Sequence, residues 1–325
     1  MEYILKQIPE DFVVKENIPE LSEGKGYILL MMEKRDCDMM SSLEKISRHF
    51  GISKREIGYC GMKDKKAVTY QYITIPPKVK KEQISKFNDQ RISLSYVKEV
   101  DEPLHLGDLK SNSFEITVRG LAHEKQFEIE KIPNYFGEQR FGSNNDEIGR
   151  SLVKRDFQKA VQLLLLDNKR KKQILSHLED SPNDYVGALG KVPLDILIFF
   201  IHSFQSRLWN DMLSLYISKE GITNLTYEDT LAIPGFGSEC SEKFIDYYDE
   251  VLENEGIEER DFIIREIPRL SSEGDERRVL MHYSNLSYDF ENDEKNEKKK
   301  KCVLCFSLSK GSYATVLVDS IFKHL

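Results

Sequence analysis

One carboxylate stands among lysines in the most unusual stretch of the sequence. Asp64 follows Lys63 and precedes Lys65 and Lys66, and Gly61 stands three residues before it. A carboxylate beside cations stays ionised, because opposite charge favours the charged form, and an ionised aspartate can act as a nucleophile, a base or an ion-pair partner. The glycine can let a substrate approach the backbone closely. A charged hairpin turn, in which Lys and Asp are common, is the structural alternative, and spacing alone favours it.

A second cluster gathers aromatic, amide and guanidinium groups within residues 133–142, which read Pro-Asn-Tyr-Phe-Gly-Glu-Gln-Arg-Phe-Gly. Aromatic faces stack exposed bases, while Asn and Arg side chains can bond base edges or phosphate. Asn134, Phe136 and Arg140 are the candidates for such contacts. The structural alternative is a loop whose Phe side chains anchor it to the core. That is the commoner fate of Phe, and on these residues alone it is the better interpretation.

Strands are predicted on both sides of Asp64. The segments 57–62 and 68–75 flank the charged turn, and the second stops where Pro76 and Pro77 follow. Turn residues separate these from other short apolar runs of strand character. The further strands predicted in the first part of the chain are 12–14, 27–32, 92–97 and 113–118.

A helix is predicted over 41–51, ahead of these two strands. Ser41 and Glu44 form a capping box at its start, and Gly51 ends it. From about 124 to 217 the helical period dominates the sequence. The clearest other helices are predicted at 152–166, 194–217 and 314–322.

Strands return near the C-terminus, at 279–288 and 302–308, after a loop-rich acidic stretch at 220–262. The charged segment 291–301 between them reads as a solvated hairpin loop, with RNA backbone contact as the alternative. Strands at both ends of the chain and helices between them indicate a discontinuous domain with an insertion. We predict an α/β fold of the α+β kind with a mixed or antiparallel sheet, in which 1–150 and 279–325 form one domain and 151–278 the insertion.

The composition is that of a globular chain, with 40% hydrophobic and 31% charged residues among 325. No run approaches the roughly 18 apolar residues of a membrane span, and no secretory signal is visible. Five sparse cysteines indicate a reducing compartment, so we expect a cytoplasmic protein. Cys302 and Cys305 would point to opposite faces of a strand, so we expect no metal site there.

The net charge of −8 is unevenly spread along the chain. Residues 221–262 carry 12 acidic and 2 basic groups, so the net charge does not exclude a local basic groove for nucleic acid elsewhere.

Five segments of the chain carry a likeness to a known family. In sequence order they are Lys6-Gln-Ile-Pro-Glu-Asp-Phe-Val-Val14, Gly61-Met-Lys-Asp-Lys-Lys-Ala-Val-Thr-Tyr-Gln71, Asn134-Tyr-Phe-Gly-Glu-Gln-Arg-Phe-Gly142, Phe204-Gln-Ser-Arg-Leu-Trp-Asn210 and Leu308-Ser-Lys-Gly-Ser-Tyr-Ala-Thr315. Together they resemble the TruD family of tRNA pseudouridine synthases. The second and third segments are highly specific, although Trp209 stands where Phe is more familiar. The likeness is poorest at 155–200 and 215–275, and a weaker likeness appears at Arg277-Arg278.

The resemblance implies an isomerase that converts one uridine of tRNA to pseudouridine, characteristically uridine 13, without metal or other cofactor. It implies the pseudouridine-synthase catalytic domain interrupted by an inserted domain special to the family. Asp64 matches the catalytic aspartate, which either attacks C1′ of the sugar or serves as a base at C2′, and both routes stay open. The target nucleotide must be extruded from its stack. We expect tRNA as the partner, no membrane association, and a monomer.

Roles for five other residues follow from the resemblance. Lys6 matches the basic residue expected beside the aspartate, and Lys63 either shares that task or contacts phosphate. Phe136 takes the place of the aromatic ring that packs on the target base. Asn134 would orient the base or the aspartate, and Arg140 would order its loop or bind phosphate.

Other functions fit the sequence less well. A methyltransferase should show a glycine-rich turn after its first strand, and a metal-dependent nuclease needs clustered carboxylates or histidines; neither pattern is visible. An RNA-binding module that has lost activity is disfavoured by the presence of Asp64, Lys6 and Phe136. A tRNA-folding chaperone without catalysis stays as the alternative, and tRNA binding that survives loss of Asp64 would support it.

Overall fold

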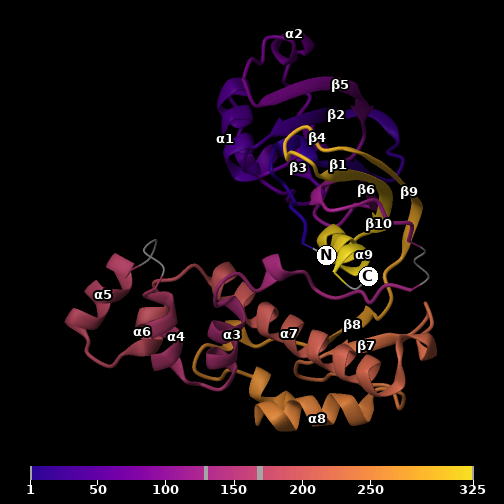
Figure 1. The fold of residues 1–325 in the computed structure, drawn as a ribbon. Helices are drawn as coiled ribbons and strands as arrows, with labels where there is room; N and C mark the ends of the chain where they lie inside the picture. Colours follow the sequence, from indigo (N-terminus) through magenta and orange to yellow (C-terminus); the bar gives the residue numbers. More distant parts are fainter. Residues whose placement is uncertain (1, 128–130, 167–170, 324–325) are drawn as a thin grey trace. The chain divides into compact units, whose positions relative to one another are not determined.

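The computed structural model describes residues 2–127, 131–166 and 171–323, and the chain divides into two compact units (Figure 1). The sheet unit comprises Met1–Ile129 and His282–Leu325, and the helical unit comprises Glu130–Met281. The sequence placed the boundaries at 150/151 and 278/279, and the first of these falls within helix α3 (Asn145–Val153). No helix in the described ranges is long and apolar enough to cross a membrane.

The sheet unit is built on a mixed sheet of eight strands, which confirms the predicted fold class. Seven of them run in the order β5-β2-β4-β1-β6-β10-β9, and β3 pairs with β4. All pairs are antiparallel except β1 with β4. The strands are β1 (Phe12–Asn17), β2 (Glu23–Arg35), β3 (Gly58–Tyr59), β4 (Val68–Ile75), β5 (Ile92–Val100), β6 (Ser111–Leu121), β9 (Tyr283–Asn292) and β10 (Lys300–Ser309).

The one parallel pair determines which loops meet. Val13 of β1 pairs with Val68 of β4, so the segments that precede both strands emerge at the same edge of the sheet. Lys6 lies in the first of these segments and Asp64 in the second. The antiparallel strand β2 ends at this edge too, because Arg35 pairs with Val68.

Helix α1 (Met39–Phe50) covers one face of the sheet, and the residue that caps its N-terminus differs from the predicted one. The helix begins after Asp38, whose Oδ1 accepts a hydrogen bond from the Ser41 amide at 3.0 Å. The predicted capping box of Ser41 and Glu44 is therefore wrong. Asp38 lies three residues ahead of Ser41 and satisfies an early free N–H of the helix. The predicted stop is confirmed, because Gly51 has φ +64°. The other helices of the unit are α2 (Lys81–Ile84), α9 (Ala314–Phe322) and the 3₁₀ turns Pro9–Asp11 and Lys54–Glu56.

Two predicted strands have other bounds in the structure. The strand at 57–62 is only Gly58–Tyr59, because the chain after it leaves the sheet as the loop that carries Asp64. The strand predicted at 279–288 is displaced by four residues, because β9 runs from Tyr283 to Asn292. Residues 279–282 connect it to β8 (Asp275–Arg278), which belongs to a separate two-stranded sheet of the helical unit.

The predicted hairpin between β9 and β10 is confirmed, but part of it is buried. Asp293 accepts hydrogen bonds from Arg119 Nη1 and the Gly120 amide at 2.9 Å, from the Lys295 amide at 3.0 Å and from Asn296 Nδ2 at 2.8 Å. Burial alone would raise the pKa of this carboxyl, but these hydrogen bonds outweigh it and lower the pKa to about 2. Asp293 therefore fastens the turn at 293–299 to the end of β6.

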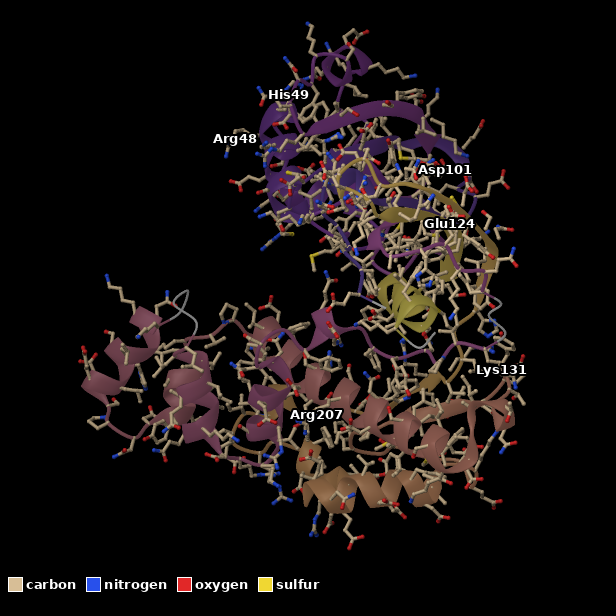
Figure 2. All side chains as sticks on the ribbon, in the orientation of Figure 1. Arg48, His49, Asp101, Glu124, Lys131 and Arg207 are labelled. Atoms are coloured by element: carbon tan, nitrogen blue, oxygen red, sulfur yellow. The ribbon has the colours of Figure 1, made fainter. Side chains whose placement is uncertain are left out.

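Asp293→Asn should lower the free energy of unfolding by about 2 kcal/mol at neutral pH, because the pKa difference between 3.8 and about 2 corresponds to that energy. A carboxyl with a depressed folded pKa stabilises above its unfolded value, and this contribution is lost as pH falls toward 2. Urea unfolding between pH 7 and 3 should show the difference shrinking below pH 4. The exposed Asp101→Asn is the control (Figure 2), and equal stabilities of the Asp293 variant and wild type at pH 7 would contradict the prediction.

The helical unit is organised around α7 (Leu194–Glu220), which is buried along much of its length. Helix α3 crosses it closely, since a Cβ on Gly149 would lie 2.0 Å from the Phe200 carbonyl oxygen. On α7, Arg207 (Figure 2) pairs with Glu147 at 2.8 Å and with Glu255 at 2.5 Å. The other elements are α4 (Phe157–Leu164), α5 (Lys171–Asp180), α6 (Tyr185–Leu189), α8 (Ile245–Glu255), β7 (Thr230–Ile233) and the 3₁₀ turns Glu138–Arg140, Ile222–Asn224, Glu259–Phe262 and Pro268–Leu270.

The helix predicted over 152–166 is wrong as a single element. Helix α3 ends at Val153, and Arg155 has φ +58°, which interrupts the helical path. Asp156 then caps α4 by accepting a hydrogen bond from the Lys159 amide at 3.0 Å. The helical spacing of apolar residues continues across residues 154–156, which is why the sequence predicted one helix. The cap at Asp156 nevertheless starts a second helix.

Candidate active site

Asp64 and Lys6 meet at the sheet edge that the parallel strands share. Lys6 Nζ lies 3.2 Å from Asp64 Oδ1, and the side chains are 14% and 28% exposed. The lysine ammonium also lies 3.9 Å from the centre of the Phe12 ring. Lys6 has φ +54°, a backbone conformation that side chains other than glycine rarely adopt. The sequence-predicted proximity of the two groups is confirmed, and the carboxylate stays accessible from solvent.

A buried lysine that the sequence analysis missed holds the loop of Asp64. Lys34 of β2 is 0% exposed, and its Nζ donates to the carbonyl oxygens of Asp64 at 2.6 Å, Cys37 at 3.1 Å and Lys63 at 3.3 Å. Burial lowers the pKa of this ammonium, and the charge of Asp64 opposes that effect. The signal in the sequence was the alternation of β2, which places Lys34 on the same face as Leu30 and Met32.

Lys63 does not face Asp64. Its Nζ lies 2.6 Å from Glu16 Oε1, and both side chains are nearly inaccessible to solvent. The other oxygen of Glu16 accepts a hydrogen bond from the Tyr72 amide at 3.0 Å. The pair therefore ties the loop of Asp64 to β1 and β4, and the sequence could not indicate which of the neighbouring lysines turns inward.

The predicted substrate residues of the helical unit form a separate cluster around Arg277. Asn134 is buried, and its side chain donates to the Arg278 carbonyl at 3.1 Å. Arg277 donates through Nε and Nη2 to the Asn134 carbonyl at 2.9 and 2.8 Å, and through Nη2 to its Oδ1 at 3.0 Å. The same guanidinium lies 4.1 Å from the centre of the Phe136 ring. Arg277 thus joins two residues that the sequence singled out, yet it appeared there only as a weaker family likeness.

Two residues of α7 fix the position of Phe136, one through its backbone and one through its ring. Asn210 of α7 accepts from the Phe136 amide at 2.9 Å and donates to its carbonyl at 3.0 Å. Trp209 meets the ring edge to face, with centroids 5.6 Å apart. The segment 204–210 therefore positions the aromatic loop by packing and hydrogen bonds.

A cleft of about 770 Å³ opens beside this cluster within the helical unit. Phe136, Arg140 and Arg277 line it, together with Ser206 of α7, whose Oγ accepts from Arg140 Nε at 3.3 Å. The Arg140 guanidinium also lies over the Phe199 ring at 5.3 Å. Three carboxylates, of Glu273, Asp275 and Glu276, line the cleft as well. The two guanidinium groups and the aromatic ring are suited to a planar ligand such as a nucleotide, whose phosphate would have to lie on the arginine side of the cleft.

The two groups of residues offer different chemistry. In the sheet unit an aspartate paired with an ammonium can supply a nucleophilic or basic oxygen. In the helical unit the aromatic and guanidinium groups can hold a base and its phosphate but supply no base or nucleophile of their own. Across the described ranges, no three His, Cys, Asp or Glu side chains gather as a metal-binding group.

Known proteins resemble this chain along almost its whole length. The family model described as tRNA pseudouridine synthase D (TruD) matches residues 1–174, 166–235 and 226–321. A Methanocaldococcus jannaschii protein named "Probable tRNA pseudouridine synthase D 2" is 30% identical over 396 residues, which cover 98% of this chain and 91% of that protein. A Methanopyrus kandleri protein named "Probable tRNA pseudouridine synthase D" is 30% identical over 354 residues, which cover 92% and 86%.

A solved structure agrees with these relatives. The crystal structure of a Methanosarcina mazei protein that bears the same family name superposes with a TM-score of 0.77 at 25% identity. The match covers 98% of this chain and 93% of that one. Both the sheet unit and the helical unit therefore have counterparts in a single known fold.

Proposed function

Because the chain belongs to the tRNA pseudouridine synthase D family, we propose that it isomerises uridine 13 of tRNA to pseudouridine with Asp64 as the reacting carboxylate. The reaction breaks the bond between N1 of uracil and C1′ of the sugar, turns the base and joins C5 to C1′. The C5 proton then leaves and N1 is protonated. Asp64 acts either as the nucleophile at C1′ or as the base at C2′.

The Lys6–Asp64 ion pair is the observation that carries this proposal. Either route needs a carboxylate that is ionised and that the sugar of an extruded nucleotide can reach. The ammonium at 3.2 Å supplies the compensating charge, and the partial exposure of Asp64 supplies the access. Lys34 and the Lys63–Glu16 pair hold the loop from behind, so they act on Asp64 through its backbone.

The helical unit offers its own contacts for the tRNA. We assign base stacking to Phe136 and phosphate contact to Arg140, while Asn134 and Arg277 keep the aromatic loop in shape. The sheet unit corresponds to the catalytic domain and the helical unit to the family's insertion. The proposed enzyme acts as a monomer on tRNA without metal or cofactor. A tRNA chaperone without catalysis is the weaker candidate, because binding alone does not require an aspartate paired with a lysine.

The proposal is tested by adding the enzyme to tRNA that lacks the modification and mapping pseudouridine at nucleotide resolution. We expect a single new pseudouridine at position 13. A product at another position would contradict the proposed target, and unmodified tRNA after incubation with enzyme that binds it would contradict the reaction.

Phe136→Ala should reduce kcat/KM by roughly 5- to 150-fold, since stacking of one base is worth about 1–3 kcal/mol. The ring also packs on Trp209, so truncation alone would confuse stacking with folding. Phe136→Leu separates them, because it restores apolar volume without an aromatic face. Single-turnover kinetics that recover fully in Phe136→Leu would exclude the stacking role.

A further inference from the structure

A second cleft, of about 1240 Å³, lies in the sheet unit and has no role in the chemistry described above. The N-terminal residues 2–5 form one wall, and the hairpin turn between β9 and β10 forms another through Lys295, Asn296 and Lys299. The lining is completed by Gly120 of β6, Ala122, Lys323 after α9 and the carboxylate of Glu297 on the turn. The cleft is therefore assembled from both ends of the chain.

The ammonium groups in and around this cleft differ in their pairing. Lys323 lines it and pairs with Asp319 at 2.8 Å, and Lys300 and Lys301, just outside the lining, pair with Glu124 and Glu294 at 2.8 Å. Lys295 and Lys299 are exposed, line the cleft and make no ion pair among the described residues. Two exposed ammonium groups on one turn are the arrangement that binds neighbouring phosphates.

The turn is fixed in place rather than left to move on the surface. Asp293 holds it by the Lys295 amide, and the Asp293 amide donates to the Lys299 carbonyl at 3.0 Å, so both lysines leave from anchored backbone. Arg119, which is buried, binds Asp293 at 2.9 Å and Glu294 at 2.9 Å. An anchored turn loses little conformational freedom when it binds a ligand.

The cleft is connected to the catalytic pair through the chain itself. Leu5 lines the cleft, and the next residue, Lys6, pairs with Asp64. Arg119 also binds Asp11 at 2.8 Å, and the other Asp11 oxygen accepts from the Ile8 amide at 3.0 Å. The same guanidinium thus holds the hairpin turn and the segment that presents Lys6.

We propose that this cleft binds the phosphodiester backbone of tRNA beside the target uridine, with Lys295 and Lys299 each contacting a phosphate. The inference rests on the proposed function, and it assigns a strand-binding surface next to the reacting residues. RNA is favoured over a protein partner because two exposed ammonium groups, unpaired within the described part of the chain, line the cleft, and its wall at Leu5 is followed in the chain by Lys6 of the catalytic pair. A chain with a net charge of −8 also needs local cations to approach a polyanion.

The test compares two substitutions in the same turn. In Lys295→Gln/Lys299→Gln both proposed contacts are lost, whereas Lys298→Gln removes one exposed charge that does not line the cleft. Filter binding of tRNA over a range of salt concentrations measures the number of phosphates contacted. For the double variant we expect the slope of log K against log salt to fall by about 1.4 to 1.8, and affinity at 0.1 M salt to fall by roughly 25- to 60-fold. Lys298→Gln should leave the slope within experimental error of wild type.

The outcomes separate the cleft from general electrostatics. If the double variant and Lys298→Gln changed the salt slope equally per charge removed, the effect would be a long-range electrostatic field, and the proposed site would be overturned. An unchanged slope in the double variant would overturn it as well. Lys295→Arg/Lys299→Arg should restore the wild-type slope, which excludes a folding defect. Binding is read without turnover, so tRNA that binds through these lysines but acquires no pseudouridine would contradict the proposed function and leave the cleft supported.

Discussion

Asp64→Asn should abolish pseudouridine formation while leaving tRNA affinity unchanged. Asparagine keeps the size of the side chain, but it offers neither a negative oxygen to attack C1′ nor a base for the C2′ proton. A general base alone contributes about 10²–10⁴ in rate, so turnover should fall by at least about a hundredfold, and further if the carboxylate is the nucleophile. Tritium release from tRNA labelled at C5 of uridine measures turnover, and filter binding measures affinity.

The matched control is Asp101→Asn, which makes the same change at an exposed carboxyl of the same unit. It should keep wild-type turnover. Tritium release by Asp64→Asn at more than a tenth of the wild-type rate would remove Asp64 from the chemistry. Loss of binding together with turnover would instead point to a folding role for the charged loop.

Lys34→Met should reduce kcat by about a hundredfold, although Lys34 does not approach the substrate. Its ammonium holds the main-chain oxygens of Lys63 and Asp64, and displacing a catalytic group by about 1 Å costs on the order of 10² in rate. One buried and two partly buried carbonyl oxygens would lose their donor, at up to about 1–3 kcal/mol each. Relief of the buried charge offsets part of this, so we expect a net loss of about 1–3 kcal/mol of stability.

Lys98→Met provides a matched comparison for this variant. Lys98 also sits on a strand of the sheet and donates to a main-chain carbonyl, that of Leu21 at 2.7 Å, but this carbonyl is not in the loop of Asp64. We expect lower stability with unchanged kcat. If Lys34→Met and Lys98→Met lose kcat equally, or if only KM changes in Lys34→Met, the positioning role is contradicted.

The pH dependence of stability offers an independent readout of Lys34. Its folded pKa lies below the ordinary value of 10.5 because of burial, so the unfolded chain binds more protons between the two values. Stability should therefore rise with pH in that interval relative to Lys34→Met, in which the group is absent. Urea unfolding at pH 8 to 10.5 measures this difference.

Local signals predicted local structure well. Strand 68–75 was placed to the residue, because its alternation ends at two prolines that cannot extend the ladder. Helix α9 was placed equally well, and α7 was extended by only three residues at its C-terminus. The family motifs brought Lys6 to Asp64 across 58 residues, which no local pattern could have done.

Ion pairs and hydrogen bonds between residues far apart in the sequence could not be predicted. Lys63 turns to Glu16, and Arg277 reaches back to Asn134 and Phe136, because strand pairing and packing bring those segments together. Lys34 was overlooked because a lysine between Glu33 and Arg35 reads as solvent-exposed, although strand alternation turns it inward. The burial of a charged residue depends on a distant carboxylate or carbonyl, and no local pattern reveals that partner.

The order of strands has a consequence for how the molecule is made on the ribosome. Strand β6 lies between β1 and β10, but β10 is translated only after the whole helical unit. Until then one side of β6 presents unpaired amides and carbonyls to solvent, a state that invites pairing with other chains. The segment before the helical unit already holds both Lys6 and Asp64, yet Arg119 can bind Asp293 and Glu294 only after that unit has been translated. The sheet therefore cannot be completed until β9 and β10 have been made.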